Sequence, residues 1–364
     1  MDMKYPPPID PANETRKITA FIKKTFKEAR KTNAVIAVSG GVDSTTSLFL
    51  TTKALGPQNI TCLFLPAKTT APIHWEHILR SCKNARIPQE KILTIPIGGI
   101  IQKSWNRIKL SSQIDENEGD KFSKNNEAAR ETNFRASHRP GKQPGSTDNR
   151  DTITEMNLLR PRKFPLRERQ TFSAAKQIAA TRGQTVAKFT PDRRNINRQI
   201  ASLNRLRLAN IAARTRMVVI FDQAKLHDAL VVGTENQSEH LLGYFTRFGD
   251  EASDVEPIRH LYKIQVRELA KFLEVPREII DKPPTAGLWI GQTDEAELGF
   301  SYEDADPILF LHYEQQKPPK EIIKLLTEST QRNTKEDEKL VKKVLRYCEQ
   351  MSFKHNLPYM LSRS

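Results

Sequence analysis

The sequence predicts an α/β protein with a doubly wound parallel sheet. Three short apolar runs, 35–38, 59–65 and 91–97, alternate with stretches whose apolar residues recur at helical spacing. A fourth run, 229–234, follows a long helical stretch further along the chain. Strands that alternate with helices form parallel sheets through crossover connections. Ligands of such sheets bind beyond the carboxyl ends of the strands, so the loops that follow the runs are candidate sites.

The helices are predicted from apolar residues that recur every three or four positions. Residues 13–31 form the first helix, in which apolar residues recur at Ile18, Phe21, Ile22 and Phe26. The same spacing predicts helices at 73–84, 203–229, 261–273, 302–313, 320–328 and 336–351, and a further helix that opens at 235–239. Residues 1–12 are rich in proline, which favours an extended lead-in.

The segment that joins the first strand to the next helix, residues 39–44, reads Ser-Gly-Gly-Val-Asp-Ser. A loop before a helix presents free backbone N–H groups and the positive end of the helix dipole, which together bind anions. Gly40 and Gly41 have no Cβ atom, so the backbone can turn sharply and approach a ligand closely. Asp43 would repel a phosphate group, and the simplest reason for its presence is a bridging Mg²⁺.

Two interpretations of this loop are open. In the simpler one, it is a glycine turn before a helix that Asp43 or Ser44 caps. In the other, residues 39–44 resemble the pyrophosphate loop of the ATP pyrophosphatases, which cleave ATP between the α- and β-phosphates. The complete string favours the second interpretation. A Walker A motif is excluded because Gly-Lys-Ser/Thr is absent.

The composition limits which binding partners and which cellular compartment are plausible for this protein. The chain of 364 residues carries a net charge of +15, which makes polyanions such as nucleotides plausible partners. No apolar run reaches the roughly 18 residues of a membrane span. Residues 1–11 lack the apolar core of a signal peptide, so we expect a cytoplasmic protein without a membrane anchor. Cys62, Cys82 and Cys348 lie far apart and fit free thiols in a reducing compartment.

A long polar and basic segment separates the two halves of the α/β pattern. So long a loop is unusual inside a compact domain, and we interpret it as an insertion that is flexible or partly helical. The sequence predicts a first half at 1–103, the insertion at 104–202 and a second half at 203–364. The basic charge suggests an arm that binds RNA or an acidic partner. No aromatic ribonucleoprotein motif supports that role, so we favour a solvated segment.

Five blocks of the chain resemble the NAD synthetase family, over 13–100 and 203–358. The blocks are residues 39–44, 210–217, 233–239, 243–250 and 282–289. The segment 282–295, rich in glycine and proline, looks most like the archaeal type and would be a mobile lid that includes Asp294. The resemblance implies a sheet like that of the adenine nucleotide alpha hydrolases.

The resemblance implies an enzyme, a C–N ligase that performs the last step of NAD biosynthesis. Such a homodimer converts deamido-NAD, ATP and ammonia into NAD, AMP and pyrophosphate, with Mg²⁺ bound. The resemblance assigns the binding of ATP to Ala37, Val38, Ser39, Gly40, Gly41, Val42, Asp43, Ser44, Thr234, Lys263 and Thr285. It assigns the binding of Mg²⁺ to Asp43 and Glu239. It assigns deamido-NAD to Arg214, Arg247, Asp254 and Lys354, partly across the dimer interface. The catalytic candidates are Asp43, Lys263 and Asp254, of which Asp254 would accept the ammonium proton.

The chain departs from the family pattern in several places. Arg247 stands where lysine is common, Phe353 where histidine is usual and Ala209 where glycine is usual, and the insertion has no counterpart. Glutamine-dependent relatives carry an amidase domain with a catalytic cysteine before the phosphate loop. Only 38 residues precede Ser39 and none is cysteine, so we expect free ammonia or a separate glutaminase to supply the nitrogen.

Two rival interpretations accompany this one. A tRNA-modifying ATP pyrophosphatase would bind RNA through the basic insertion, but thiolating members need catalytic cysteines, and the cysteine spacing here gives no support. A non-catalytic nucleic-acid-binding protein could retain the fold without activity. The presence of Asp43, Glu239 and Lys263 speaks against that second rival.

Overall fold

The computed structural model describes residues 5–67, 70, 72–108, 193–285, 287, 291–330, 333–356, 358 and 360–361, leaving aside the side chains of 72, 193–201 and 330. The chain divides into two units, Met1–Lys109 with Asn204–Ser364, and Leu110–Leu203. Most of the predicted insertion therefore lies outside the described residues. At its edges, residues 98–108 and α6 (Arg193–Leu226) are helical, so helix continues into the predicted 104–202 from both sides.

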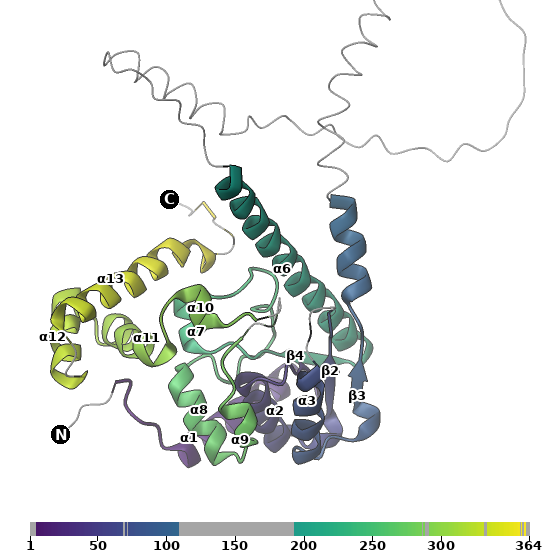
Figure 1. Ribbon diagram of the computed structural model, residues 1–364. Coiled ribbons are helices and arrows are strands. Elements are labelled where there is room, and N and C mark those ends of the chain that lie inside the picture. The colour runs from purple at the N-terminus through teal and green to yellow at the C-terminus, as the bar shows by residue number, and fades with distance from the viewer. Residues whose placement is uncertain are drawn as a thin grey trace, which may run out of the picture. The chain divides into compact units, whose positions relative to one another are not determined.

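A four-stranded parallel sheet forms the centre of the first unit (Figure 1). Its strand order is β3-β2-β1-β4. The strands are β1 (Asn33–Ala37), β2 (Ile60–Phe64), β3 (Ile92–Thr94) and β4 (Ala229–Val232). The register pairs Val35 of β1 with Thr61 on one side and Val231 on the other. The parallel sheet confirms the prediction, although β3 ends at Thr94 instead of at residue 97.

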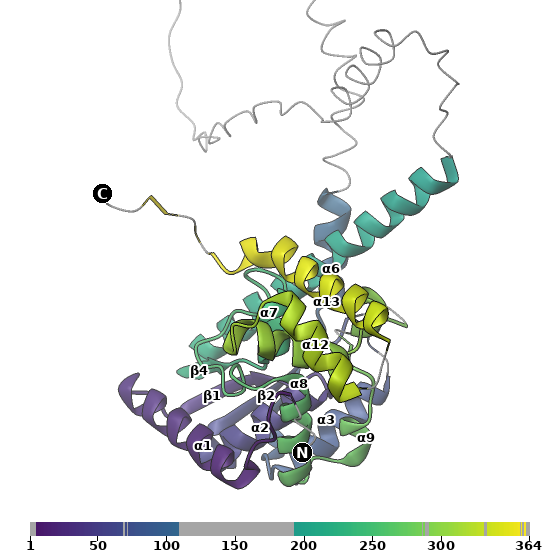
Figure 2. The ribbon, with the colours of Figure 1, turned by 90° about the vertical axis from the view of Figure 1, so that its left-hand side faces the viewer.

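Helices cover both faces of the sheet because successive strand residues point to opposite sides. Ile36 packs into a hydrophobic core with side chains of α1 (Pro11–Glu28), α2 (Val42–Leu55), α3 (Pro72–Asn84) and α8 (Lys263–Phe272). Val35, its neighbour in the strand, packs on the opposite face against Ala212 and Ala224 of α6. Figure 2 shows α1 and α2 alongside β1 and β2.

The C-terminal helices build a second hydrophobic core around α11 (Tyr302–Leu309). It includes residues of α7 (Gln237–Leu242), α12 (Pro319–Thr330) and α13 (Thr334–Met351). The predicted helix 302–313 changes type, because α11 ends at Leu309 and a π-helical turn, Phe310–Glu314, follows. The remaining short elements are α9 (Arg277–Ile280), α10 (Asp294–Leu298) and the 3₁₀ turns Pro57–Asn59, Gln89–Lys91 and Ser352–Lys354.

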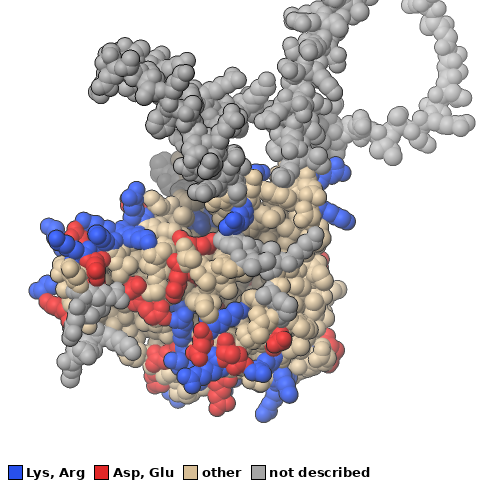
Figure 3. All heavy atoms as spheres, in the orientation of Figure 1, with Lys and Arg blue, Asp and Glu red and all other residues tan. Residues whose placement is uncertain are grey.

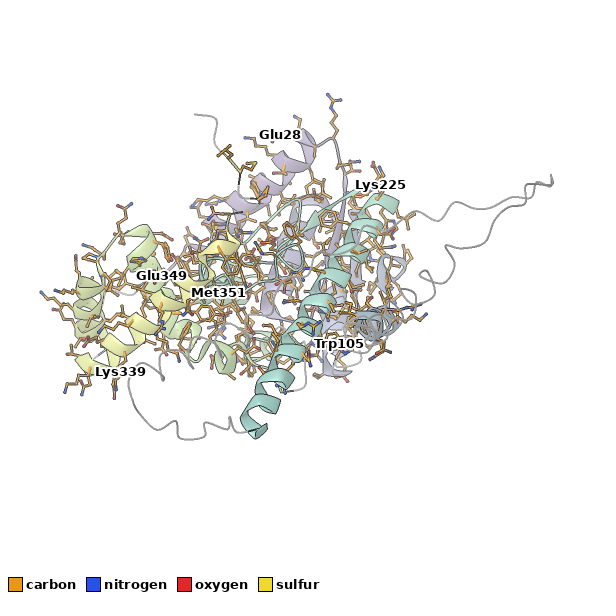
Figure 4. The ribbon with its side chains drawn as sticks, turned by 90° about the horizontal axis from the view of Figure 1, so that it is seen from above. Glu28, Trp105, Lys225, Lys339, Glu349 and Met351 are labelled. Atoms are coloured by element: carbon orange, nitrogen blue, oxygen red, sulfur yellow. The ribbon has the colours of Figure 1, made fainter. Side chains whose placement is uncertain are left out.

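The face of the molecule shown in Figure 3 is mixed in charge. On the face shown in Figure 3, lysine and arginine side chains lie among aspartate and glutamate. Residues 98–108 lie beside α6, where the Arg207 guanidinium is 5.3 Å from the centre of the Trp105 ring (Figure 4). Within the described part of the chain, no helix is both long and apolar enough to cross a bilayer.

Candidate active site

The loop between β1 and α2 makes a tight turn that only glycine fits. Gly40 has a φ of +74°, in the left-handed region that other residues rarely adopt. A Cβ atom added there would lie 3.0 Å from the carbonyl oxygen of His74 and 3.1 Å from Cβ of His77, because α3 packs directly on the turn. The sequence prediction of a close backbone turn at this position is confirmed.

Hydroxyl groups hold the loop in shape, and the helix N-terminus carries no side-chain cap. The backbone N–H of Ser39 donates to Oγ of Ser44 at 3.2 Å, and that hydroxyl lies 3.1 Å from Gly41 O. Gly41 is the N-cap of α2 and no side chain caps it. The interpretation of Asp43 or Ser44 as a helix cap is therefore wrong. The N–H groups of the first turn have no acceptor within the helix, which suits an anion.

Three charged residues from three helices meet beyond this loop. Nζ of Lys263 lies 2.5 Å from Oδ2 of Asp43 and 3.1 Å from Oε1 of Glu239. The lysine side chain is only 2% exposed, whereas Asp43 and Glu239 are 17% and 18% exposed. The structure therefore brings together the two predicted metal ligands and the predicted catalytic lysine.

Asn236 is a member of this group that the sequence analysis missed. Its amide Nδ2 donates to Oδ1 of Asp43 at 3.0 Å. Its Oδ1 also accepts the backbone N–H of Glu239 at 3.0 Å, so Asn236 caps α7 in a capping box with Glu239. The signal was available, since asparagine three residues before glutamate at a predicted helix start is a capping-box pattern. Asn236 thus orients both carboxylates.

Asp306 fixes the ends of the two helices that carry Glu239 and Lys263. It is fully buried, and it accepts the Ser238 hydroxyl at 2.5 Å and the N–H of Ile264 at 3.0 Å. The Ser238 hydroxyl in turn accepts the N–H of Lys263 at 2.8 Å. Asp306 lies four residues after Tyr302 on the apolar face of its helix, which is the sequence signal for a buried partner.

The electrostatic balance keeps the lysine charged. Burial by itself would lower the pKa of Lys263, but the negative charges of Asp43 and Glu239 outweigh burial and raise it above its ordinary value. Burial raises the pKa of Glu239 to about 8, against the opposing attraction of the Lys263 ammonium. The group therefore holds a fixed cation and a carboxylate that titrates near neutral pH.

A third carboxylate lies near the group. Asp294, at the start of α10, is 3% exposed, and it accepts the hydroxyls of Tyr244 and Tyr302, each at 3.2 Å. The Tyr302 ring also faces Lys263, whose Nζ is 5.1 Å from the ring centre. Burial raises the pKa of Asp294. Asp294 was predicted to belong to a lid, of which residues 286 and 288–290 lie outside the described residues.

The pair Asp43 and Glu239 fits Mg²⁺ better than a metal held by protein alone. Among the described residues, no group of three or more His, Cys, Asp or Glu side chains could hold a metal ion. Mg²⁺ usually takes one or two carboxylates and fills its other positions with phosphate oxygens and water. Two partly exposed carboxylates beside the predicted phosphate loop match that donor set.

Three of the four residues predicted to bind deamido-NAD, Arg214, Arg247 and Lys354, gather around the segment 243–247. Nζ of Lys354 donates to the carbonyl oxygens of Gly243 and Phe245 at 2.6 and 2.8 Å. Nε of Arg214 donates to the carbonyl oxygen of Arg247 at 3.1 Å. The Arg247 guanidinium lies 5.2 Å from the ring centre of Phe353, the residue that departs from the family pattern. Tyr244 of the same segment reaches Asp294, so the two groups adjoin.

Asp254, Thr285 and Thr234 are further residues that the sequence predicts for the site. Asp254 is exposed, and its Oδ2 accepts the N–H of Val231 at 2.8 Å. In the described residues no hydrogen bond joins Asp254 to Asp43 or Lys263. Thr285 accepts the N–H of Gly287 at 3.1 Å, and the half-buried Thr234 follows β4.

Comparison with known proteins identifies the family. The family model described as NAD synthase matches residues 14–139 and 165–358. The NH(3)-dependent NAD(+) synthetase of Methanocaldococcus jannaschii is 31% identical over 308 residues, which is 85% of this chain and 83% of that protein. The enzyme of the same name from Thermoplasma acidophilum is 42% identical over 164 residues, which span 45% of this chain and 61% of the relative, less than two thirds of its length.

Solved structures agree on the fold. An NMN synthetase from Francisella tularensis aligns with a TM-score of 0.59 and 22% identity, over 98% of this chain and all of that chain. An NH3-dependent NAD synthetase from Campylobacter jejuni aligns with a TM-score of 0.55 and 21% identity, over 97% of this chain and all of that chain. At such identities these structures support the fold alone. The sequence matches go further: the chain belongs to the NAD synthase family.

Proposed function

We propose that this protein is an ammonia-dependent NAD synthetase, a ligase that amidates deamido-NAD at the expense of ATP. The observation that carries the proposal is the convergence of Asp43, Glu239 and Lys263 beside the glycine loop at the carboxyl end of β1. Membership of the NAD synthase family supports the same reaction and gives no support to the tRNA-modifying alternative.

The reaction explains why a triphosphate site is needed. A carboxylate of the pyridine ring does not react with ammonia directly, because oxide is too poor a leaving group. One carboxylate oxygen first bonds to the α-phosphorus of ATP while the bond to pyrophosphate breaks. Ammonia then bonds to the carbonyl carbon, AMP leaves with the electron pair of its bond, and the nitrogen loses a proton. The protein must align the reactants and neutralise the repulsion between two anions.

Each part of the site would have a role in this reaction. The N–H groups at residues 39–44 and the N-terminus of α2 would hold the phosphates. Lys263 would offset negative charge beside the reacting phosphorus, since its ammonium stays protonated between Asp43 and Glu239. Mg²⁺ held by Asp43 and Glu239 would supply a Lewis acid for the phosphate oxygens. We also expect Ala37, Thr234 and Thr285 to contact ATP.

The second group of residues would bind deamido-NAD. Arg214, Arg247 and Lys354 place cations around the segment 243–247, which suits the dinucleotide phosphates. Asp254 is the candidate that takes the proton from the attacking ammonia. Its carboxylate is exposed, and its backbone is anchored where the N–H donates to the carbonyl oxygen of Val231 at 2.9 Å.

We also propose a cytoplasmic homodimer with free ammonia, or a separate glutaminase, as the nitrogen source. Val218 and Leu226 of α6 are 61% and 71% exposed, which supports an association through this helix. Light scattering coupled to size exclusion should report a dimer, and Val218→Asp should weaken it. A monomeric parent protein at micromolar concentration would contradict this part of the proposal.

The reaction can be tested directly. Purified protein is incubated with ATP, Mg²⁺, deamido-NAD and ammonium, and NAD and AMP are quantified. We expect equal amounts of both, each dependent on deamido-NAD, and no product from Asp43→Asn. Glutamine in place of ammonium should give no NAD. Absence of NAD together with AMP formation on added tRNA would instead favour the RNA-modifying enzyme.

A further inference from the structure

A second lysine lies against the phosphate loop. Nζ of Lys282 is 3.1 Å from Nδ1 of His74, and the same nitrogen of His74 is 2.9 Å from the carbonyl oxygen of Ser39. His74 belongs to α3, which packs on the loop at Gly40. Lys282 lies three residues before Thr285, one of the predicted ATP contacts. A cation is therefore placed one side chain away from the loop that would hold the phosphates.

This lysine has no anionic partner in the described part of the chain. None of the ion pairs among the described residues includes Lys282, whereas Lys263 pairs with two carboxylates. Lys282 is partly buried, and burial lowers its pKa. A partly desolvated ammonium without a counter-ion is unfavourable, and it becomes favourable when a ligand brings an anion.

The contact with His74 does not satisfy the lysine. Burial lowers the pKa of His74, so the ring is neutral at physiological pH and each nitrogen either donates or accepts. Nδ1 faces the carbonyl oxygen of Ser39, which can only accept, and therefore carries the proton. It then has no lone pair for the ammonium of Lys282. The imidazole of His74 orients the carbonyl group of Ser39. The N–H groups of the Lys282 ammonium therefore remain available to donate to another acceptor.

The charges of the site show which ligand needs this cation. Asp43, Glu239 and Asp294 bring three carboxylates to the region of Lys263, whose ammonium already bonds to two of them. A triphosphate adds several negative charges, which one Mg²⁺ and a saturated lysine do not balance. Lys282 is a further cation on the loop side of the site.

We propose that Lys282 binds the β- and γ-phosphates of ATP and the pyrophosphate released from them, and that His74 is the positioning residue that holds the loop carbonyl beside it. This inference rests on the proposed function, since it assigns a residue to the leaving group of the same reaction. It predicts that Lys282 stabilises pyrophosphate more than it stabilises AMP or deamido-NAD.

The test compares Lys282→Gln with Lys339→Gln, an exposed lysine on α13 far along the chain (Figure 4). Binding of inorganic pyrophosphate is measured by calorimetry with Mg²⁺ present, and AMP is the matched ligand without β- and γ-phosphates. Loss of one charge-assisted contact should weaken pyrophosphate binding and raise KM for ATP by about 10- to 100-fold. AMP binding and KM for deamido-NAD should stay within about twofold of the parent values.

Two further variants separate contact from positioning. Lys282→Arg keeps a cation and should recover part of the pyrophosphate affinity. His74→Asn keeps a donor for the Ser39 carbonyl and should bind pyrophosphate better than His74→Ala. Circular dichroism confirms that each variant is folded.

Three results would overturn the proposal: unchanged pyrophosphate affinity in Lys282→Gln, an equal loss of AMP affinity, or no pyrophosphate binding by the parent protein. NAD formation by the parent protein is scored separately, so failure of this inference is distinguishable from failure of the proposed function.

Discussion

The ammonium of Lys263 lies 2.5 Å from the carboxylate of Asp43, although 220 residues separate them in the chain. Asp43 lies in the first turn of α2, and Lys263 is the first residue of α8. Helix N-termini favour negative charge, so a lysine at such a position needs nearby carboxylates. The pair lets α8 begin with a buried cation and holds the carboxylate of Asp43 in place.

Removal of the lysine should make stability strongly dependent on pH. In Lys263→Met, Asp43 and Glu239 face each other without a cation, and we expect turnover to be lost. The pKa of Glu239, about 8 in the parent protein, should rise further without the Lys263 ammonium, so the folded variant keeps this proton to higher pH than the parent does. Because the folded state binds more protons, stability falls as pH rises above the unfolded value of about 4.5. Urea unfolding should show a loss of about 3–5 kcal/mol at alkaline pH and a smaller loss at pH 5.

The control for this experiment is Lys271→Met, an exposed position on the same helix. Its unfolding free energy should stay within about 0.5 kcal/mol of the parent at every pH. If the unfolding free energies of Lys263→Met and of the parent protein changed with pH in parallel, the lysine would not balance the charge of the two carboxylates.

Binding of Mg²⁺ should depend on pH through Glu239. Burial raises the pKa of this carboxyl to about 8, and a metal requires its deprotonated form. Affinity should therefore rise with pH up to about 8, by at most tenfold per unit, and level off above it. Calorimetry in buffers of different ionisation enthalpy should show proton release near pH 7. Glu239→Gln, with no proton to release, should bind weakly with a flat profile in this range.

Substitution of Gly40 should damage the loop without harming the rest of the fold. Gly40→Ala forces a non-glycine residue to a φ of +74° and places Cβ 3.0 Å from the His74 carbonyl oxygen. We expect a loss of about 1–3 kcal/mol and a large rise in KM for ATP. Gly99→Ala is the matched control, because no atom lies within 4 Å of the added Cβ. Equal effects of both substitutions would contradict the close approach of α3.

Loss of Asp306 should affect catalysis without any contact to substrate. Asp306→Ala leaves the buried N–H of Ile264 and the hydroxyl of Ser238 without their acceptor, at a cost of about 1–3 kcal/mol. Because those groups fix the starts of α7 and α8, Glu239 and Lys263 should move and kcat should fall more than KM rises. Thermal unfolding and steady-state kinetics measure the two effects, and a change in KM alone would show that Asp306 does not position them.

The pH profile of Asp306→Asn gives an independent check. Burial raises the pKa of Asp306 to about 7 from 3.8, so the folded protein takes up a proton that the unfolded chain releases. This group makes stability fall as pH rises between those two values. The asparagine variant lacks the proton and should show a shallower decline over that window.

The sequence alone determined the parts of this protein that depend on local pattern. Apolar periodicity gave the parallel α/β class and the helix faces, because alternate strand residues and every third or fourth helix residue must meet the core. Residues 39–44 indicated a phosphate loop because the complete string Ser-Gly-Gly-Val-Asp-Ser follows an apolar strand and precedes a helix. Asp43 and Glu239 are candidates from the blocks that contain them, and Lys263 is a candidate from the family resemblance, near the start of the predicted helix 261–273.

Only the tertiary structure decided how these candidates meet. Lys263 bonds to Asp43 and Glu239 because α2, α7 and α8 start near one another, and spacing along the chain carries no information on distances across 200 residues. The roles of Asn236 and Asp306 likewise depend on rotamers that packing selects. A local pattern fixes which face a residue occupies, whereas its hydrogen-bond partner depends on which other element the folded chain brings to that face.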